Sequence, residues 1–209
     1  DDAYASQVEA DDLLGDVAPP PAEDFKRAGS GKADKKRLKA IPVAKAARRV
    51  DWTKKALALA NSRKARAPMG PFEPQLAKLG DSPPKGEHWV HEIKWDGYRI
   101  LATVAEGEVR LWSRNALEWT NRIPEIRDAI AALGLTSGAL DGELIAGRGT
   151  KEDFNLLQAT LSGERQGALS YALFDLLHVN GVDIAGAPLL ERKALLEDVL
   201  KGAPTHLAM

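Results

Sequence analysis

The sequence has 209 residues, of which 44% are hydrophobic and 28% charged, with a net charge of −1. This composition is typical of a protein with a packed core. The absence of cysteine excludes disulfides, thiolate nucleophiles and cysteine-based zinc sites. No apolar run reaches the length of about 18 residues that a membrane span requires. The first residues, DDAYASQ, contain neither a methionine nor a signal-peptide pattern, so we expect a segment cut from a longer protein.

The charges are separated along the chain. Residues 1–24 carry eight acidic side chains and no lysine or arginine, whereas residues 25–66 carry fifteen basic and two acidic ones. Residues 67–209 carry fourteen basic and twenty acidic side chains. Such segregation marks the first third as a different kind of chain from the rest.

Residues 1–66 are therefore predicted to be a charged linker or tail that is largely disordered, because few large apolar groups are available to offset ordering entropy. Asp51 to Ala67 contains good helix formers and is compatible with a short basic helix. Two interpretations of the basic cluster stay open, namely contact with DNA phosphates and a merely soluble linker. The cluster comprises Lys35, Lys36, Arg37 and Lys39.

Residues 67–209 have the pattern of a folded domain. The segment HWVHEIKW, residues 88–95, resembles a strand that ends near Lys94. A hairpin is predicted from residues 98–104 and 109–112, with a turn at Glu106-Gly107.

Further along, helical spacing of apolar residues predicts helices at 123–133, 151–161 and 188–200. Short apolar runs predict strands at 138–147 and 170–179. Mixed helices and strands with a hairpin between early strands predict an α+β domain with an antiparallel sheet.

Polar groups cluster at the ends of these predicted strands, close to glycines. A single DGE tripeptide is usually a turn, and a lone phenylalanine in a strand is usually core. Together, cations, carboxylates and an aromatic ring predict a site for a polyanionic nucleotide. The residues concerned are Lys94, Asp96, Arg99, Arg114, Asp141, Glu143, Phe174 and Asp175.

The order of these motifs resembles a known family. KWDGYR matches the K-x-D-G-x-R signature of covalent nucleotidyltransferases, which include ATP-dependent DNA ligases, RNA ligases and messenger-RNA capping enzymes. SRN, LDGEL and YALFDLLHVNGVDI resemble the next three motifs, in the expected order. Over residues 68–209 the chain looks most similar to the ligase domain of bacterial DNA ligase D.

The resemblance implies that Lys94 attacks the α-phosphorus of ATP and becomes adenylated. AMP then passes to a DNA 5′-phosphate, and a 3′-hydroxyl seals the break. A lysine amine in water has a pKa of about 10.4, so burial or a bound metal is needed to favour the neutral nucleophile.

The resemblance also implies roles for the residues near Lys94. Glu92 meets the adenine edge through its backbone or side chain. Asp96 organises the lysine or its metal shell, and Gly97 permits a tight turn beside the nucleotide. Arg99 contacts ribose hydroxyls or phosphates, a role that suits the bidentate guanidinium fork.

Three residues further along the chain are implied to share the site. Arg114 contacts ribose hydroxyls or phosphates, and Glu143 holds a ribose hydroxyl or Mg²⁺. Phe174 stacks on adenine. Asp96 and Glu143 are thus the implied metal ligands, and the implied cofactors are ATP and Mg²⁺ or Mn²⁺.

Three other charged residues are not expected to belong to the site. Asp141 and Asp175 are predicted to brace local turns. Arg192 is predicted to lie on the solvated face of the last amphipathic helix.

The family has two further motifs, E-G-[ILV]-[VI] and K-x-K, which do not appear after Phe174. The implied fold is therefore the N-terminal part of an adenylation domain (nucleotidyltransferase, ATP-grasp-like) with an antiparallel sheet, preceded by the charged linker. Because half of the nucleotide pocket is expected to be missing, we expect this chain alone to be inactive in sealing.

The resemblance implies a DNA ligase of bacterial double-strand-break repair by end joining, acting in the cytoplasm at the nucleoid. Its implied partners are nicked or broken duplex DNA and a Ku-type DNA-end-binding protein, with no membrane and a monomeric state. Two alternatives stay open at this point. One is a non-catalytic DNA-binding or scaffold fragment with a ligase-like fold. The other is an RNA ligase or capping-type nucleotidyltransferase.

Overall fold

The computed structural model describes residues 50–78 and 80–209. Its centre is a seven-stranded sheet in the order β1-β6-β5-β4-β2-β3, with β7 paired to β5. The β5–β7 pair is parallel and the other pairs are antiparallel. The strands are β1 (Arg63–Lys64), β2 (Tyr98–Ala105), β3 (Glu108–Ser113), β4 (Ser137–Ala146), β5 (Leu169–Val179), β6 (Val182–Asp183) and β7 (Leu207–Ala208). The predicted α+β class and antiparallel sheet are confirmed.

The predicted hairpin is formed by β2 and β3. Its two turn residues both adopt positive φ, 51° at Glu106 and 82° at Gly107. Positive φ at both central positions is typical of a type I′ turn, whose twist matches that of the flanking strands. The short turn places the two strands in register from Ile100↔Ser113 to Ala105↔Glu108.

Four helices are described in the part of the chain that the structure covers: α2 (Trp52–Leu57), α3 (Pro124–Ala131), α4 (Phe154–Leu161) and α5 (Leu189–Leu200). Pro124 starts α3, where its missing amide hydrogen costs nothing. Pro188 lies one residue before α5, as its N-cap. The three helices predicted in the folded part are therefore confirmed with small shifts of their ends.

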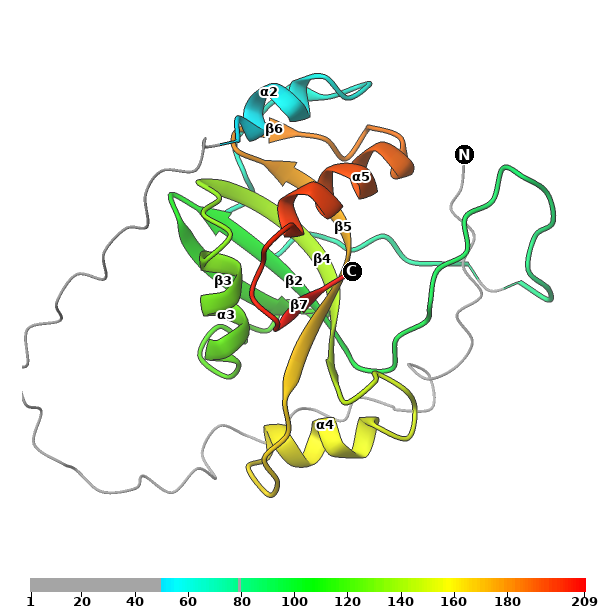
Figure 1. Ribbon diagram of the computed structural model, residues 1–209, viewed down its shortest axis with the longest axis vertical. Helices are drawn as coiled ribbons and strands as arrows, with labels where there is room; N and C mark the ends of the chain where they lie inside the picture. Colours follow the sequence, from blue (N-terminus) through cyan, green and yellow to red (C-terminus); the bar gives the residue numbers. More distant parts are fainter. Residues whose placement is uncertain (1–49, 79) are drawn as a thin grey trace, which may run out of the picture.

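One face of the sheet carries the main hydrophobic core. Alternate residues of β2, namely Ile100, Ala102 and Val104, belong to this core. α3 packs against β3 and β5, and α5 packs against β5, so both helices cover this face (Figure 1). Because side chains alternate along a strand, Arg99 and Leu101 point to the opposite face.

The strand predicted at residues 88–95 is wrong. From residue 65 to residue 97 the described chain contains no helix or strand (Figure 1). Val90 is 42% exposed and Ile93 is 71% exposed, so neither packs in a sheet. Strand propensity expresses fit to a half-buried pleated surface, and no neighbouring strand pairs with this segment.

The predicted domain boundary at residue 66 also differs from the structure. Residues 50–66 form α2 and β1 and pack on the sheet, with Ala56 fully buried. Thr53 Oγ1 donates to Asn180 O at 2.8 Å, and His178 Nε2 lies 3.0 Å from Ala65 O. Residues 50–66 therefore belong to the same folded unit as the sheet. The predicted disorder of residues 1–49, and the basic cluster at 35–39, lie outside the described residues.

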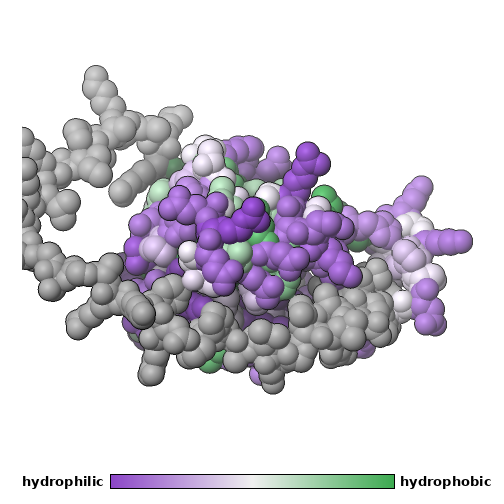
Figure 2. All heavy atoms as spheres, turned by 90° about the horizontal axis from the view of Figure 1, so that it is seen from below, coloured by the Kyte–Doolittle hydropathy of each residue, from purple (hydrophilic) through white to green (hydrophobic). Residues whose placement is uncertain are grey.

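The visible described surface in Figure 2 is mostly hydrophilic, with hydrophobic residues in small areas. Among the described residues, no helix has the length and apolar character needed to cross a membrane.

Candidate functional site

Lys94 lies on the irregular segment that leads into β2. Its Nζ donates to Asp96 Oδ1 at 2.6 Å, and the two side chains are 39% and 26% exposed. The backbone amide of Asp96 in turn donates to Gly149 O at 3.0 Å. The Lys94 amine is therefore accessible to solvent. Its orientation is fixed by the carboxylate of Asp96, and the segment that carries both residues is anchored to the loop after β4.

Gly97 explains why the chain can come so close to the sheet at this point. A β-carbon on Gly97 would lie 2.0 Å from Leu144 O and 3.1 Å from Glu143 Cγ. Backbone atoms cannot yield to such a clash, so only glycine fits. The glycine is thus required for close approach to β4, and not for the tight turn that was predicted. It brings the Lys94 segment next to Glu143.

A second glycine, which the sequence analysis missed, supports the same segment. Gly149 has φ of 68°, and a β-carbon there would lie 2.7 Å from Trp95 Cε3 and 2.9 Å from Ile145 Cδ1. Trp95, next to Lys94, therefore packs over a position that has to be glycine. The signal in the sequence was the Gly147-Arg148-Gly149 repeat after the LDGEL motif.

Arg99 forms a bidentate ion pair with Asp141. Nε lies 3.0 Å from Oδ1 and Nη2 lies 2.7 Å from Oδ2. Asp141 is only 3% exposed; burial raises its pKa, and the hydrogen bonds from Arg99 oppose this rise. Burial acts to lower the pKa of Arg99, but the hydrogen bond to Asp141 and the negative charges of Asp141 and Glu143 together outweigh it and raise that pKa. Asp141 therefore holds Arg99 from the neighbouring strand β4. The prediction that Asp141 braces a local turn is wrong.

Phe174 reaches the same face through a β-bulge. Gly142 pairs with Leu173 and Asp141 pairs with Asp175, so Phe174 is the extra residue on β5. A bulge redirects a side chain and is often found beside an active site. The Phe174 ring centroid lies 5.3 Å from Arg99 Cζ, within the range of a cation–π contact.

The strand register places two further predicted residues at this end of the sheet. Glu143 lies directly opposite Arg99 in the β2–β4 pair. Ser113 pairs with Ile100 at the end of β3, so the exposed Arg114 follows at the same end. The structure thus places Gly97, Arg99, Glu143 and Phe174 close together, with Arg114 at the neighbouring strand end. Lys94 and Asp96 lie on the segment that Gly97 joins to β2.

Glu92 lies on the other side of Lys94 along the chain and forms an ion pair with Lys193 of α5. Lys193 Nζ also donates to Phe174 O at 2.9 Å. This lysine was missed by the sequence analysis, because nothing in the local pattern of α5 connects it with Glu92.

The predictions for Arg192 and Asp175 are wrong. Arg192 is only 8% exposed, and its Nε and Nη2 donate to the two carboxylate oxygens of Asp175 at 2.8 and 2.9 Å. Arg192 Nη1 also donates to Ala187 O at 2.5 Å. The pair is a buried clamp between α5 and β5, and not a solvated arginine and a turn aspartate.

Within the described residues, no group of three or more histidine or acidic side chains is placed to hold a metal ion by itself. Mg²⁺ commonly takes only one or two protein carboxylates and fills its other positions with water and phosphate oxygens. Asp96 and Glu143 lie on adjoining backbone segments, as the contact at Gly97 shows, so the donor set fits that second kind of site.

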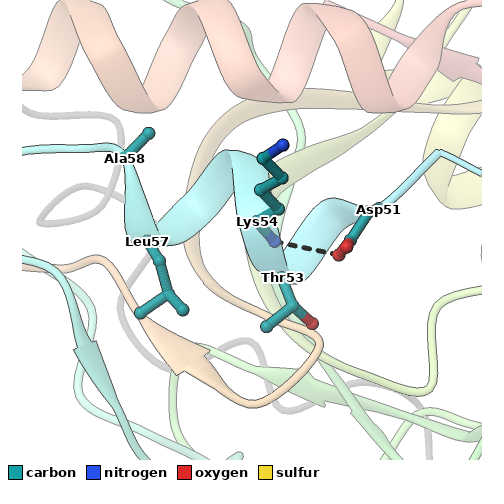
Figure 3. Close-up of a pocket in the computed structure, with 5 residues that line it drawn as sticks. All are labelled: Asp51, Thr53, Lys54, Leu57 and Ala58. Carbon is teal, nitrogen blue, oxygen red and sulfur yellow. Dashed lines mark hydrogen bonds between the residues drawn. The ribbon is translucent and has the colours of Figure 1, made fainter.

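A depression along α2 is separate from these residues. It is lined by Asp51, Thr53, Lys54, Leu57 and Ala58, and the dashed line in Figure 3 marks the N-cap bond from Lys54 N to Asp51 Oδ1. None of its lining residues belongs to the motifs that contain Lys94, Arg99 or Glu143.

Comparison with known proteins decides the family. The family model described as "ATP dependent DNA ligase domain" matches residues 74–209. The chain belongs to this family. The match covers the Lys94 segment, the strands that carry Arg99, Glu143 and Phe174, and α5.

Individual relatives agree with this assignment. The chain is 42% identical over 130 residues to the multifunctional non-homologous end joining protein LigD of Pseudomonas aeruginosa, covering 62% of this chain and 15% of that protein. It is 32% identical over 205 residues to a probable DNA ligase of Beutenbergia cavernae, covering 90% of this chain and 38% of that protein. The chain thus spans well under half the length of either relative.

A solved structure, the ligase domain of LigD from M. tuberculosis, is 29% identical to this chain with a TM-score of 0.47. The alignment covers 56% of this chain and 39% of that one.

Proposed function

We propose that this chain is the nucleotide-accepting part of an ATP-dependent DNA ligase and that Lys94 is its nucleophile. The observation that carries the proposal is the position of Lys94. It is held by Asp96 at 2.6 Å, at the end of the sheet where Arg99, Glu143 and Phe174 converge, inside the match to the ligase family.

In the proposed reaction the Lys94 amine loses a proton and its nitrogen forms a bond to the α-phosphorus of ATP. The bond from that phosphorus to the bridging oxygen breaks, and pyrophosphate leaves. Asp96 orients Nζ, and orientation of reactants supplies much of the rate in such transfers. The AMP then passes to a 5′-phosphate of DNA, and a 3′-hydroxyl displaces it.

The remaining residues have proposed roles in binding. Phe174 offers an aromatic face to adenine, on the side of the ring away from Arg99. Arg99 and Arg114 supply positive charge for ribose hydroxyls or phosphates, and Glu143 accepts from a ribose hydroxyl or holds the cation. Mg²⁺ or Mn²⁺, held by Asp96 and Glu143, neutralises phosphate charge when bound.

The test is transfer of label from α-labelled ATP to protein, using the longest native polypeptide that contains this sequence. We expect Lys94→Ala to abolish labelling, because it removes the amine that is proposed to accept AMP. Lys85→Ala, which removes an exposed lysine from the same irregular segment, serves as the matched control and should label normally. Label that survives Lys94→Ala would show that another residue accepts AMP.

The DNA step is proposed from the relatives. One of them is named for non-homologous end joining, and we extend that role to this chain, with broken or nicked duplex DNA as substrate and a Ku-type protein as partner. Sealing of a nicked DNA duplex with ATP, compared with GTP and with a nicked RNA duplex, separates a DNA ligase from the RNA ligase and capping alternatives. Co-purification with the Ku-type protein and sedimentation test the proposed partner and the monomeric state.

A further inference from the structure

Lys193 holds two segments that are far apart in the sequence. Its side chain is 15% exposed, and its single ammonium group forms an ion pair with Glu92 and donates to Phe174 O at 2.9 Å. Glu92 precedes Lys94 by two residues, and Phe174 is the bulge residue of β5. One largely buried cation thus links the nucleophile segment with the strand that carries the aromatic ring.

The neighbouring residue of α5 strengthens this connection. Arg192 grips the Asp175 carboxylate, while Lys193 takes the backbone carbonyl of Phe174. Two consecutive cations of α5 therefore hold two consecutive residues of β5 at the bulge. A bulge residue is left out of the regular ladder, so the bond from Lys193 supplies a partner to its carbonyl and stabilises the turned-out ring.

We propose that Lys193 is a positioning residue for base selection, which sets Glu92 and Phe174 in the arrangement that accepts adenine. This inference rests on the proposed function, which assigns Phe174 to the base, and on the family resemblance, which implies that Glu92 meets the adenine edge. The ring provides stacking, which any purine can use. A fixed carboxylate accepts a hydrogen bond from the 6-amino group of adenine and repels the 6-oxo group of guanine. Fixing Glu92 therefore decides which purine binds.

The test measures equilibrium binding of α,β-methylene-ATP and α,β-methylene-GTP by calorimetry, in the longest native polypeptide that contains this sequence. The methylene bridge prevents nucleotidyl transfer, so binding is read apart from chemistry. Lys193→Met keeps the length of the side chain and removes its charge. Lys201→Met removes an exposed lysine from the C-terminal end of the same helix and is the matched control.

We expect Lys193→Met to weaken binding of the ATP analogue about tenfold, in line with the loss of a hydrogen bond to a charged group. The preference for the ATP over the GTP analogue should fall by a similar factor, because both share the same phosphates. Lys193→Arg should restore most of the preference. The double variant Glu92→Gln with Lys193→Met should lose no more than Lys193→Met alone.

An unchanged ATP-to-GTP preference in Lys193→Met, even with a lowered melting temperature, would show a purely structural lysine and overturn the inference. Additive losses in the double variant would overturn it as well, and so would a wild-type protein that binds neither analogue. If the wild type binds selectively and Lys193→Met loses that selectivity, but Lys94 takes no label from ATP, then the proposed function fails while the role of Lys193 stands.

Discussion

Gly97 is the residue at which the backbone of the nucleophile segment meets the sheet. The contact that a β-carbon would make there is with a carbonyl oxygen of β4, which cannot move without disturbing the ladder between β2 and β4. The position of Lys94 relative to Glu143 therefore depends on the absence of a single methyl group.

Gly97→Ala should destabilise the fold by about 1–3 kcal/mol through overpacking and displace the Lys94 segment, which would lower AMP transfer. Gly70→Ala is the matched control, because its added β-carbon meets nothing within 4 Å and its φ is not positive. Urea denaturation and labelling by ATP give the two readouts. Equal behaviour of the two variants would contradict this explanation of Gly97.

The Arg99–Asp141 pair predicts a pH effect. Arg99→Met leaves the Asp141 carboxylate buried without its cation, a change that costs about 3–5 kcal/mol for buried pairs. Burial already raises the pKa of Asp141, and loss of Arg99 raises it further. A carboxyl group whose pKa is raised in the folded state lowers the free energy of unfolding as the pH rises toward that pKa.

The stability deficit of Arg99→Met relative to wild type should therefore grow between about pH 4 and pH 7. Denaturant unfolding at several pH values measures it. Arg110→Met is the control, since that arginine lies on the same hairpin and pairs with the exposed Glu108. Its stability deficit should stay small and should not change with pH. A deficit for Arg99→Met that shrinks with rising pH would contradict the assigned environment of Asp141.

At the scale of elements, α5 is fastened to β5 by the Arg192–Asp175 clamp. Arg192→Met should cost about 3 kcal/mol, because it leaves the carboxylate of Asp175, which is only 14% exposed, without its partner. The combined Arg192→Met and Asp175→Leu variant should recover much of that loss, since neither unpaired charge remains. Urea midpoints of the three proteins provide the check. A double variant less stable than Arg192→Met would exclude the clamp as the cause.

The regular elements could be predicted because their signals are local. The Glu106-Gly107 turn and the alternation on both sides of it define the β2–β3 hairpin, and apolar spacing defines α3 and α5. The segment at 88–95 has the same composition as a strand but no partner, and pairing depends on the rest of the fold. The bulge at Phe174 is likewise set by what its neighbours contact, not by its own sequence.

The site was predicted better as a set of motifs than as a set of contacts. The order of Lys94, Arg99, Glu143 and Phe174 along the chain pointed to the family, which the match over residues 74–209 confirms. The partners of these residues could not be predicted, because Asp141 and Lys193 act across strands and helices. Their carboxylate and ammonium groups look like ordinary surface charges when only the sequence is read.

At the scale of the whole molecule, the first described helix is tied to the last one. Lys55 of α2 donates to Asp198 of α5 at 2.5 Å, and Lys201 donates to the same carboxylate at 2.6 Å. Hydrogen bonds from Lys201 and then Lys55 lower the pKa of Asp198 well below its usual range, to about 2. The segment at 50–66 is thus attached to the rest of the domain by the Lys55–Asp198 ion pair as well as by the buried side chain of Ala56.

A lowered carboxyl pKa contributes stability that is present above the unfolded pKa and lost as pH falls toward the folded one. The advantage of wild type over Asp198→Asn should therefore be constant from pH 7 to about pH 4 and shrink below that. It should also shrink in high salt, because the pair is exposed. Glu125→Gln, on α3, is the control and should show no such profile. If wild type remains more stable than Asp198→Asn by the same amount at pH 3 in high salt, the ion pairs of Asp198 do not hold the two helices together.

The bulge on β5 has a consequence for how this strand can vary. Leu173 lies in the core, Phe174 lies beside Arg99 and Asp175 pairs with Arg192 of α5, so three consecutive positions make three different kinds of contact. An ordinary strand assigns its neighbours to only two faces. The extra residue therefore uncouples ligand recognition from core packing. With Phe174 in its proposed role, substitution of the ring should alter base binding while the hydrophobic interior and the attachment of α5 remain as they are.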